Sequence, residues 1–168
     1  MAVGDAQTAG APLSPLPRLA LAVLPPALAS GLGALATYPN LAWYAGLAKP
    51  SFTPPNWVFA PTWTALYALM ALAAWRVLSL SAALPLRRHA LVFFLVQLVL
   101  NAAWSWAFFG LHAPALAFFV IIGLLAGILG MLEMFWKLDR VAGLLVVPYL
   151  LWTSFAALLN YGILKLNE

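Results

Sequence analysis

Polar residues inside apolar segments are the side chains of this sequence that are best placed to do chemistry. Gln97 and Asn101 are four residues apart, so on a helix they share one face, and Trp104 lies on the same stripe about one turn later. A polar side chain inside a membrane is costly unless it is paired or lines a cavity. The stripe therefore indicates either a hydrogen-bonded helix contact or one wall of a binding pocket.

Two other apolar segments repeat this spacing. Trp63 and Tyr67 are four residues apart, and Trp152, Ala156 and Asn160 follow one another at the same interval. Three helices that each present an aromatic ring beside a polar or small residue match the requirements of a flat, mostly apolar ligand. The same stripes are also typical of ordinary helix packing, and the spacing alone leaves both interpretations open.

Other kinds of site find no support in the sequence. It contains no cysteine and only four acidic residues, and it has no Ser/His/Asp constellation, carboxylate pair, phosphate-binding loop or metal-ligand spacing. We therefore expect no metal and no required cofactor. The net charge of +4 comes from eight cations scattered over segment ends, so we interpret them as topology determinants and expect no nucleic-acid partner.

The composition determines the elements that must position these stripes. The chain has 168 residues, of which 65% are hydrophobic and 7% charged, so it is predicted to be an all-α integral membrane protein. One span needs about 20 apolar residues to cross roughly 30 Å of hydrocarbon. A disordered tail over residues 1–15 and one five-helix membrane domain over 16–168 are expected, with spans at 16–37, 57–80, 89–109, 114–136 and 141–164.

The segment from Trp43 to Tyr67 interrupts this pattern with prolines and aromatic residues. Because proline removes backbone donors and restricts the preceding residue, a regular spanning helix cannot run through residues 49–55. Irregular backbone inside hydrocarbon leaves costly unpaired amides, so this segment must lie at the interface or cover a protein-lined cavity. Tyr38 and Pro39 are expected to end the first helix, and Asn56 to cap the second.

The distribution of cations predicts the orientation of the bundle. One side carries six cations, and the other carries only two: Arg18, Arg76, Arg87, Arg88, Lys137 and Arg140 against Lys49 and Lys165. In a bacterial membrane the N-terminus and loops 2–3 and 4–5 should therefore face inward, with loop 1–2 and the C-terminus outside. An organellar membrane would preserve the same two-sidedness.

Small residues on the fourth predicted helix suggest close packing. Gly123, Gly127 and Gly130 lie in overlapping small-xxx-small patterns, which allow two helices to approach closely. We expect either a neighbouring helix or a second copy of the chain at this stripe, and a homodimer is the interpretation that we carry forward.

Three ordered blocks of the sequence closely resemble the translocator protein family, also called tryptophan-rich sensory proteins or peripheral-type benzodiazepine receptors. The first block reads W-Y-x-x-L-x-K-P-x-x-x-P-P-x-x-x-F-x-x-x-W-T-x-L-Y from Trp43 to Tyr67. The others run from Gln97 to Gly110 and from Val147 to Tyr161. The resemblance implies a five-helix bundle whose first loop covers a pocket for protoporphyrin IX, other tetrapyrroles, sterols or benzodiazepine-type ligands. Carried over by residue, that pocket would comprise Tyr44, Phe59, Trp63, Gln97, Asn101, Trp104, Trp152 and Ala156.

The resemblance also leaves alternatives for function. A receptor or sensor of porphyrins is the main expectation, and the family's sterol pattern corresponds to Leu159, Tyr161 and Lys165. Light-dependent degradation of porphyrin is the second, in which Trp63 and Trp152 match the implicated tryptophans. A porphyrin or sterol carrier is the third. The expected partners are thus these small molecules, the lipid bilayer and a second copy of the chain.

Overall fold

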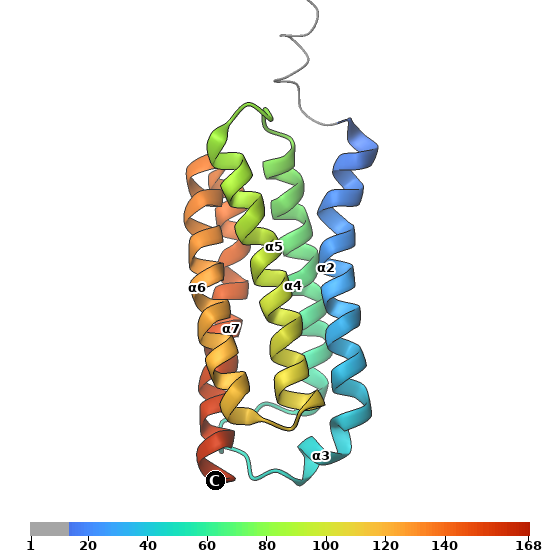
Figure 1. Cartoon of the computed structure of the whole chain (residues 1–168), viewed down its shortest axis with the longest axis vertical. Coiled ribbons are helices and arrows are strands. Elements are labelled where there is room, and N and C mark those ends of the chain that lie inside the picture. The colour runs from blue at the N-terminus through green and yellow to red at the C-terminus, as the bar shows by residue number, and fades with distance from the viewer. Residues whose placement is uncertain (1–13) are drawn as a thin grey trace, which may run out of the picture.

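The computed structural model describes residues 14–168, in which five helical stretches are long and apolar enough to cross a membrane. They lie side by side with their long axes nearly aligned (Figure 1). The predicted all-α membrane bundle is confirmed. The elements in chain order are α2 (Pro15–Thr37), η1 (Tyr38–Asn40), α3 (Leu41–Gly46), η2 (Asn56–Val58), α4 (Phe59–Leu78), α5 (Pro85–Ser105), η3 (Trp106–Gly110), α6 (Pro114–Leu138) and α7 (Arg140–Leu166).

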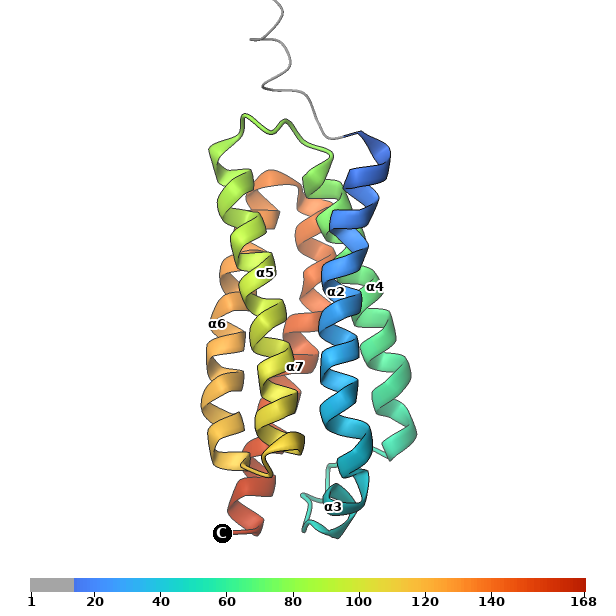
Figure 2. The ribbon, with the colours of Figure 1, turned by 45° about the vertical axis from the view of Figure 1, so that its right-hand side comes forward.

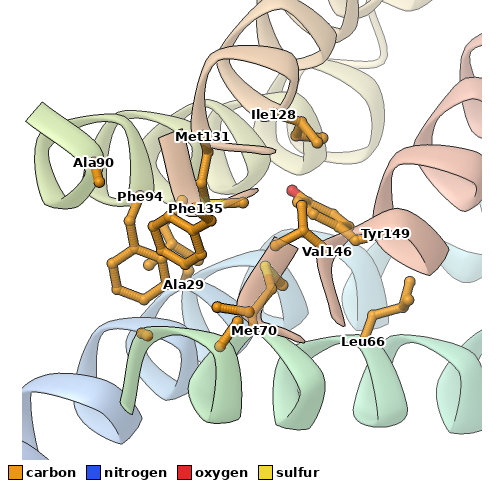
Figure 3. Packing of buried hydrophobic residues seen from close by; sticks show 14 of the residues in the cluster. Ala29, Leu66, Met70, Ala90, Phe94, Ile128, Met131, Phe135, Val146 and Tyr149 are labelled. Atoms are coloured by element: carbon orange, nitrogen blue, oxygen red, sulfur yellow. The ribbon is translucent and has the colours of Figure 1, made fainter. Parts of the chain in front are cut away.

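The packing order of the helices differs from their order in the chain. α6 packs between α5 and α7, while α2 packs against both α4 and α5, and α4 packs against α7. Figure 2 shows α2 in front of the gap between α4 and α5. The core is apolar and aromatic. In Figure 3 Phe94 and Phe135 lie against each other, with ring centroids 6.4 Å apart.

The two ends of the bundle differ in chemistry. One end carries the start of α2, the α4–α5 loop and the α6–α7 turn (Figure 1), and we call it the basic end because the six cations predicted for one side belong to these segments. The other end carries α3, the α5–α6 turn and the C-terminus. Residues 47–55, which connect α3 to η2, form what we call the lid. The predicted grouping of loop 1–2 with the C-terminus is confirmed by two hydrogen bonds between Ala48 and Asn167, of 3.0 and 2.9 Å.

Several predicted boundaries were wrong, and prolines account for two of them. α2 ends at Thr37 as predicted, but the chain does not leave helical geometry at Tyr38 and Pro39, because Pro39 fits the first turn of η1, and α3 follows to Gly46. α5 begins at Pro85 rather than His89 for the same reason. The predicted tail falls outside the described residues except for Ser14 and Pro15, and Pro15 already begins α2.

Asn56 does not cap the second helix as predicted. It starts the short 3-10 turn η2, and α4 follows from Phe59 without a side-chain cap. The irregular backbone predicted for residues 49–55 is confirmed, since this stretch contains only turns and extended residues.

The glycines on α6 serve contacts within the chain. A Cβ atom on Gly127 would lie 3.5 Å from the Cβ of Gln97, and one on Gly130 would lie within the Phe93 ring. Both residues therefore let α6 pack closely against α5. Gly123 has no atom within 4 Å of its Cβ position, so of the three predicted interface glycines it alone faces open space.

The α6–α7 turn is tighter than predicted. Only Asp139 separates the two helices, so the expected loop over residues 137–140 was wrong. The Asp139 carboxylate accepts hydrogen bonds from the amides of Val141 (2.8 Å) and Ala142 (3.1 Å), which caps α7. It also pairs with Arg76 of α4 at 2.8 Å. Nearby on α6, Glu133 and Lys137 form an ion pair at 2.6 Å.

The Asp139 cluster predicts a pH-dependent stability. Burial, the largest single influence, raises the pKa of Asp139, but the Ala142 amide, the Arg76 guanidinium and the Val141 amide together lower it below its ordinary value. A carboxyl whose pKa is lower in the folded state stabilises the fold above its unfolded pKa of about 3.9, and this contribution is lost as the pH falls further.

Asp139→Asn isolates the charge, because asparagine can still cap the helix. At neutral pH it should lower the free energy of unfolding by about 1 kcal/mol or less, since the Arg76 side chain is 40% exposed. Denaturation followed by circular dichroism from pH 7 to pH 3 would show a smaller acid-dependent loss in the variant. An identical pH profile in both proteins would contradict the prediction.

Candidate functional site

A cavity of about 360 Å³ occupies the lid half of the bundle. Within the described chain its walls come from every long helix except α6. The lining residues are Ser30, Gly33, Ala34, Thr37, Tyr38, Leu41, Tyr44, Asn56, Phe59, Ala60, Trp63, Thr64, Tyr67, Asn101, Trp104, Ser105, Phe108, Phe109, Trp152, Ala156, Leu159, Asn160 and Ile163. This volume lies within the range of about 300–1,000 Å³ that is usual for small-molecule sites.

Nine of the 23 residues that line the cavity are aromatic. The Trp152 ring meets Phe59 edge-on with centroids 5.9 Å apart, and Trp63 lies 5.8 Å from Tyr67. On α5 the Trp104 ring stacks on Phe108 at 5.6 Å. Rings that already brace one another hold their faces in fixed positions, so the wall is preorganised for a flat apolar ligand.

A chain of hydrogen bonds connects the cavity wall to the core. The Tyr67 hydroxyl donates to Asn101 Oδ1 at 2.6 Å, and Asn101 Nδ2 donates to the Tyr149 hydroxyl at 3.0 Å. The Tyr149 hydroxyl donates to Gln97 Oε1 at 2.9 Å, and Gln97 Nε2 donates to the Phe94 carbonyl at 3.0 Å. Each amide is satisfied on both sides, so the network fixes the position of Asn101 in the cavity wall.

This network yields a prediction for Tyr149→Phe. Removing the hydroxyl leaves Asn101 Nδ2 and Gln97 Oε1 buried without a partner, which should cost about 1–2 kcal/mol of unfolding free energy. Unfolding in a denaturing detergent titration would measure the loss. Tyr161→Phe is the matched control, because Tyr161 is 47% exposed on the outer face of the same helix. Equal stabilities of the two variants would show that the network contributes nothing.

A second polar contact closes the cavity near the lid end. Trp104 Nε1 donates to Asn160 Oδ1 at 3.0 Å, and Asn160 Nδ2 donates to the Pro114 carbonyl at 2.9 Å. Asn160 therefore fixes the orientation of the Trp104 ring and ties α5 to the start of α6. The predicted stripe of Trp152, Ala156 and Asn160 does face the cavity as one surface.

One donor in the cavity wall has no partner in the described chain. Trp152 Nε1 is buried and makes no hydrogen bond, although Trp104 Nε1 in the same cavity does. A buried donor without a partner costs about 1–3 kcal/mol. Because Nε1 has almost no accessible area, a ligand acceptor recovers this cost only if the Trp152 indole turns toward the cavity.

The lid is seated by contacts with α7 and by its own lysine. Pro50 packs directly against Gly162 of α7. A Cβ atom on Gly162 would lie only 2.5 Å from Pro50 Cγ. Asn167 pairs with the backbone of Ala48 as described above. Lys49 Nζ donates to the carbonyls of Ala45 (3.1 Å) and Leu47 (3.0 Å), and it lies over the Tyr44 ring at 4.7 Å. Lys49 thus closes the end of α3, which fits an interfacial residue better than a ligand contact.

The α5–α6 turn contacts η1 and α3. Residues 106–110 form a π-helical turn, closed by a 2.8 Å bond from the Leu111 amide to the Trp106 carbonyl. His112 adopts a left-handed backbone with φ of 51°, its ring stacks on Trp43 at 4.2 Å, and Nε2 lies 2.9 Å from Asn40 Oδ1. The turn therefore braces η1 and α3, which precede the lid. Within residues 14–168 no cluster of His, Cys, Asp or Glu could hold a metal ion.

The structure brings seven of the eight predicted pocket residues together. Gln97 does not line the cavity but lies fully buried behind it, where it supports Tyr149. The other seven are Tyr44, Phe59, Trp63, Asn101, Trp104, Trp152 and Ala156.

The predicted sterol pattern does not form one surface. Leu159 lines the cavity, whereas Tyr161 lies on the outer face with its ring 5.5 Å from Phe118. Lys165 pairs with Glu168 at 2.6 Å. The three residues therefore face two sides of α7, and a single ligand in the cavity would contact only Leu159.

Sequence reasoning missed the α2 wall and its hydroxyl groups. Ser30, Gly33 and Thr37 recur at helical spacing in the sequence, and this spacing could have indicated that α2 forms a wall of the cavity. Together with Thr64 of α4 and Ser105 of α5, Ser30 and Thr37 add hydroxyl groups to the cavity wall. Gly33 also lets α2 approach α5, because its Cβ position lies 3.1 Å from Ser105 Oγ.

Comparison with known proteins agrees with this architecture. The TspO/MBR family profile matches residues 21–166. The chain is similar to the tryptophan-rich sensory protein of Cereibacter sphaeroides, with 41% identity over 125 residues, covering 74% of this chain and 77% of the relative. It is 40% identical over 126 residues to protein CrtK of Rhodobacter capsulatus, covering 75% and 79%. It is 35% identical over 136 residues to the human translocator protein, covering 77% of each.

Proposed function

Because this chain belongs to the TspO/MBR family of membrane proteins, we propose that it is a receptor or sensor that binds protoporphyrin IX or a related tetrapyrrole in the cavity at the lid end of the bundle. The observation that carries the proposal is the set of Trp63, Trp104 and Trp152 around one cavity. Faces of indole rings suit a planar conjugated macrocycle. Sterols and benzodiazepine-type compounds are further flat, apolar candidates for the same walls.

The polar features of the cavity support an acidic tetrapyrrole. Trp152 Nε1 has no partner among residues 14–168, whereas the hydroxyls of Thr37 and Thr64 already donate to the carbonyls of Gly33 and Ala60 and can only accept a hydrogen bond from a ligand. A tetrapyrrole carries carboxylates and ring nitrogens that accept hydrogen bonds. Ala60 and Thr64 on α4 and Tyr38 on η1 line the cavity while remaining exposed, so a macrocycle larger than the enclosed space can extend between the two helices.

Titration with protoporphyrin IX tests the proposal. Purified protein should show saturable quenching of tryptophan fluorescence, and Trp152→Ala should weaken the affinity by about tenfold or more, since ring stacking and one hydrogen bond are lost. Trp136→Ala is the control, because Trp136 lies at the basic end and does not line the cavity. An unsaturable signal, or equal affinities in all three proteins, would reject porphyrin binding at this site.

Light-dependent degradation of porphyrin is the second candidate function. Trp63 and Trp152 both line the cavity, which would put two oxidisable indoles beside a bound porphyrin. Illuminated protoporphyrin should then decay faster with protein than without it, and faster than with Trp63→Phe. Decay of protoporphyrin at the same rate in all samples would exclude a role in degradation and leave binding as the proposed function.

We propose that the chain forms a homodimer through the lipid-facing side of α6 at Gly123. This position has open space around it, whereas Gly127 is buried against α5. Gly123→Leu should reduce the crosslinked dimer fraction in mild detergent several-fold by preventing close approach. Gly31→Leu is the control, since Gly31 on α2 also has nothing within 4 Å. An unchanged dimer fraction in Gly123→Leu would exclude this interface.

We propose that the basic end faces the cytoplasm of a bacterium. The excess of arginine and lysine at that end supports this orientation, and bacterial relatives support this kind of cell. Since the chain has no cysteine, single cysteines at Ser51 in the lid and Ala82 in the α4–α5 loop can be labelled separately. A membrane-impermeant maleimide should label Ser51→Cys on intact cells and not Ala82→Cys. The reverse pattern would invert the topology.

A further inference from the structure

The described part of the chain has no carboxylate left for several of its arginines. The whole sequence contains four acidic residues, of which Asp5 lies outside the described residues. Each of the other three is engaged with a different cation: Asp139 with Arg76, Glu133 with Lys137 and Glu168 with Lys165, at 2.8, 2.6 and 2.6 Å. The charges of Arg18 and Arg87 therefore have no carboxylate counterion within residues 14–168.

Arg87 is the most unusual of these cations because it is only 6% exposed. It lies in the first turn of α5, and its Nη2 donates to the Leu78 carbonyl at the end of α4 at 3.3 Å. Its Nε is buried and has no partner in the described chain. A buried charge is expensive unless it is paired, so one carbonyl is a poor compensation for a guanidinium group.

Arg18 of α2 reaches the same helix end. Its Nη1 donates to Ser79 Oγ at 3.0 Å, and its guanidinium lies 4.4 Å above the Trp75 ring. Its Nε is also buried without a partner in that part of the chain. Because Leu78 and Ser79 are adjacent residues, Arg18 and Arg87 both donate to the end of α4.

The start of α5 adds further positive potential at this point. Leu84 precedes the helix without a side-chain cap, and the first turn contains no acidic residue. Within residues 14–168 no acidic side chain therefore compensates the positive pole of this helix. Arg88, the next residue, is exposed and adds another charge. Helix starts with these properties are favourable sites for phosphate groups.

We propose that the junction of α4 and α5 binds the phosphate of an anionic phospholipid headgroup, with Arg87 and Arg18 as its ligands. A phosphate accepts two hydrogen bonds from the fork of a guanidinium group, which would engage the unpaired Nε atoms. The junction lies where two membrane spans end, at Leu78 and Pro85, and this is the depth of the lipid headgroups. A lipid phosphate is held at that depth, whereas a soluble phosphate is not.

Lipid binding to the purified full chain tests this site. Native mass spectrometry and thermal unfolding in detergent would compare phosphatidylglycerol with phosphatidylcholine of the same acyl chains. The wild-type protein should bind phosphatidylglycerol selectively and gain thermal stability saturably. Arg87→Gln should weaken this binding by at least about tenfold, the loss expected when a charge-assisted hydrogen bond is removed. Arg140→Gln removes the same charge from an exposed position at the same end and should leave the affinity nearly unchanged.

Each remaining arm decides between specific outcomes. Arg87→Lys keeps the positive charge but lacks the forked guanidinium group, so it should also lose selectivity for phosphatidylglycerol. This variant tests the site if Arg87→Gln does not fold. Equal losses of phosphatidylglycerol affinity in Arg140→Gln and Arg87→Gln would show that the lipid is attracted by the overall positive charge of this end. That result would overturn a specific site. Inorganic phosphate that stabilises the protein as well as the lipid at equal concentration would overturn the lipid assignment. If selectivity for phosphatidylglycerol appears only in Asp5→Asn, the Asp5 carboxylate rather than a lipid occupies the site in the wild-type protein.

Discussion

Ala156→Phe should abolish porphyrin binding while the bundle remains folded. Ala156 lies one turn from Trp152 on α7 and lines the cavity. A phenyl ring placed there would occupy the space in which a ligand would contact the Trp152 face. We expect the affinity for protoporphyrin IX to fall by at least about 100-fold, which corresponds to roughly 2.7 kcal/mol.

Fluorescence titration of the variant measures this effect directly. Leu158→Phe is the matched control, because Leu158 is on the same helix, is 63% exposed and faces away from the cavity. Circular dichroism and the thermal midpoint should be similar in both variants. Wild-type affinity in Ala156→Phe would show that the ligand binds elsewhere, and an equal loss in Leu158→Phe would assign the effect to a general disturbance of α7.

Gly162→Val should unseat the lid. The Cβ position of residue 162 lies 2.5 Å from Pro50 Cγ, far inside contact distance, and the lid is an irregular segment whose displacement is easier than that of a membrane helix. We expect a broad-specificity protease to cut residues 49–53 several-fold faster than in the wild type. Porphyrin should protect this stretch in the wild type and protect it much less in the variant, because a displaced lid no longer closes over the ligand.

The control for this experiment is Gly123→Val, which introduces the same side chain on a helix where no atom lies within 4 Å. Its cleavage rate should match that of the wild type. Protease resistance unchanged in Gly162→Val would mean that Pro50 accommodates the new side chain and that the Asn167 contacts with Ala48 suffice to hold the lid.

Much of the candidate site follows from local sequence patterns. The stripes that contain Asn101 and Trp104 and the stripe of Trp152 and Ala156 place each set on one helix face, and those faces do line the cavity. The interruption of the spans by residues 49–55 also follows from the prolines alone, since their missing donors exclude a regular helix there. Resemblance to the family added Tyr44 and Phe59, which no spacing argument had selected.

The rotation of each helix about its own axis was beyond sequence reasoning. Gln97 shares a stripe with Asn101, yet it is fully buried behind the wall, and Gly127 faces α5 rather than a second chain. In a soluble bundle the contrast between polar and apolar faces would settle such rotations. In a membrane the lipid side and the protein side of a helix are both apolar, so that contrast is missing.

The sequence by itself determined the number of spans, the irregular lid, the two-sided charge and the helix faces that carry aromatic and polar groups, because these depend on hydropathy, proline and helical periodicity. Only the tertiary structure decided which faces meet. It added the α2 wall at Ser30 and Thr37, left Trp152 Nε1 without a partner among residues 14–168 and brought Arg18 and Arg87 to one helix end. These features join residues from different helices, and contacts of that kind are set by packing across the bundle rather than by local spacing.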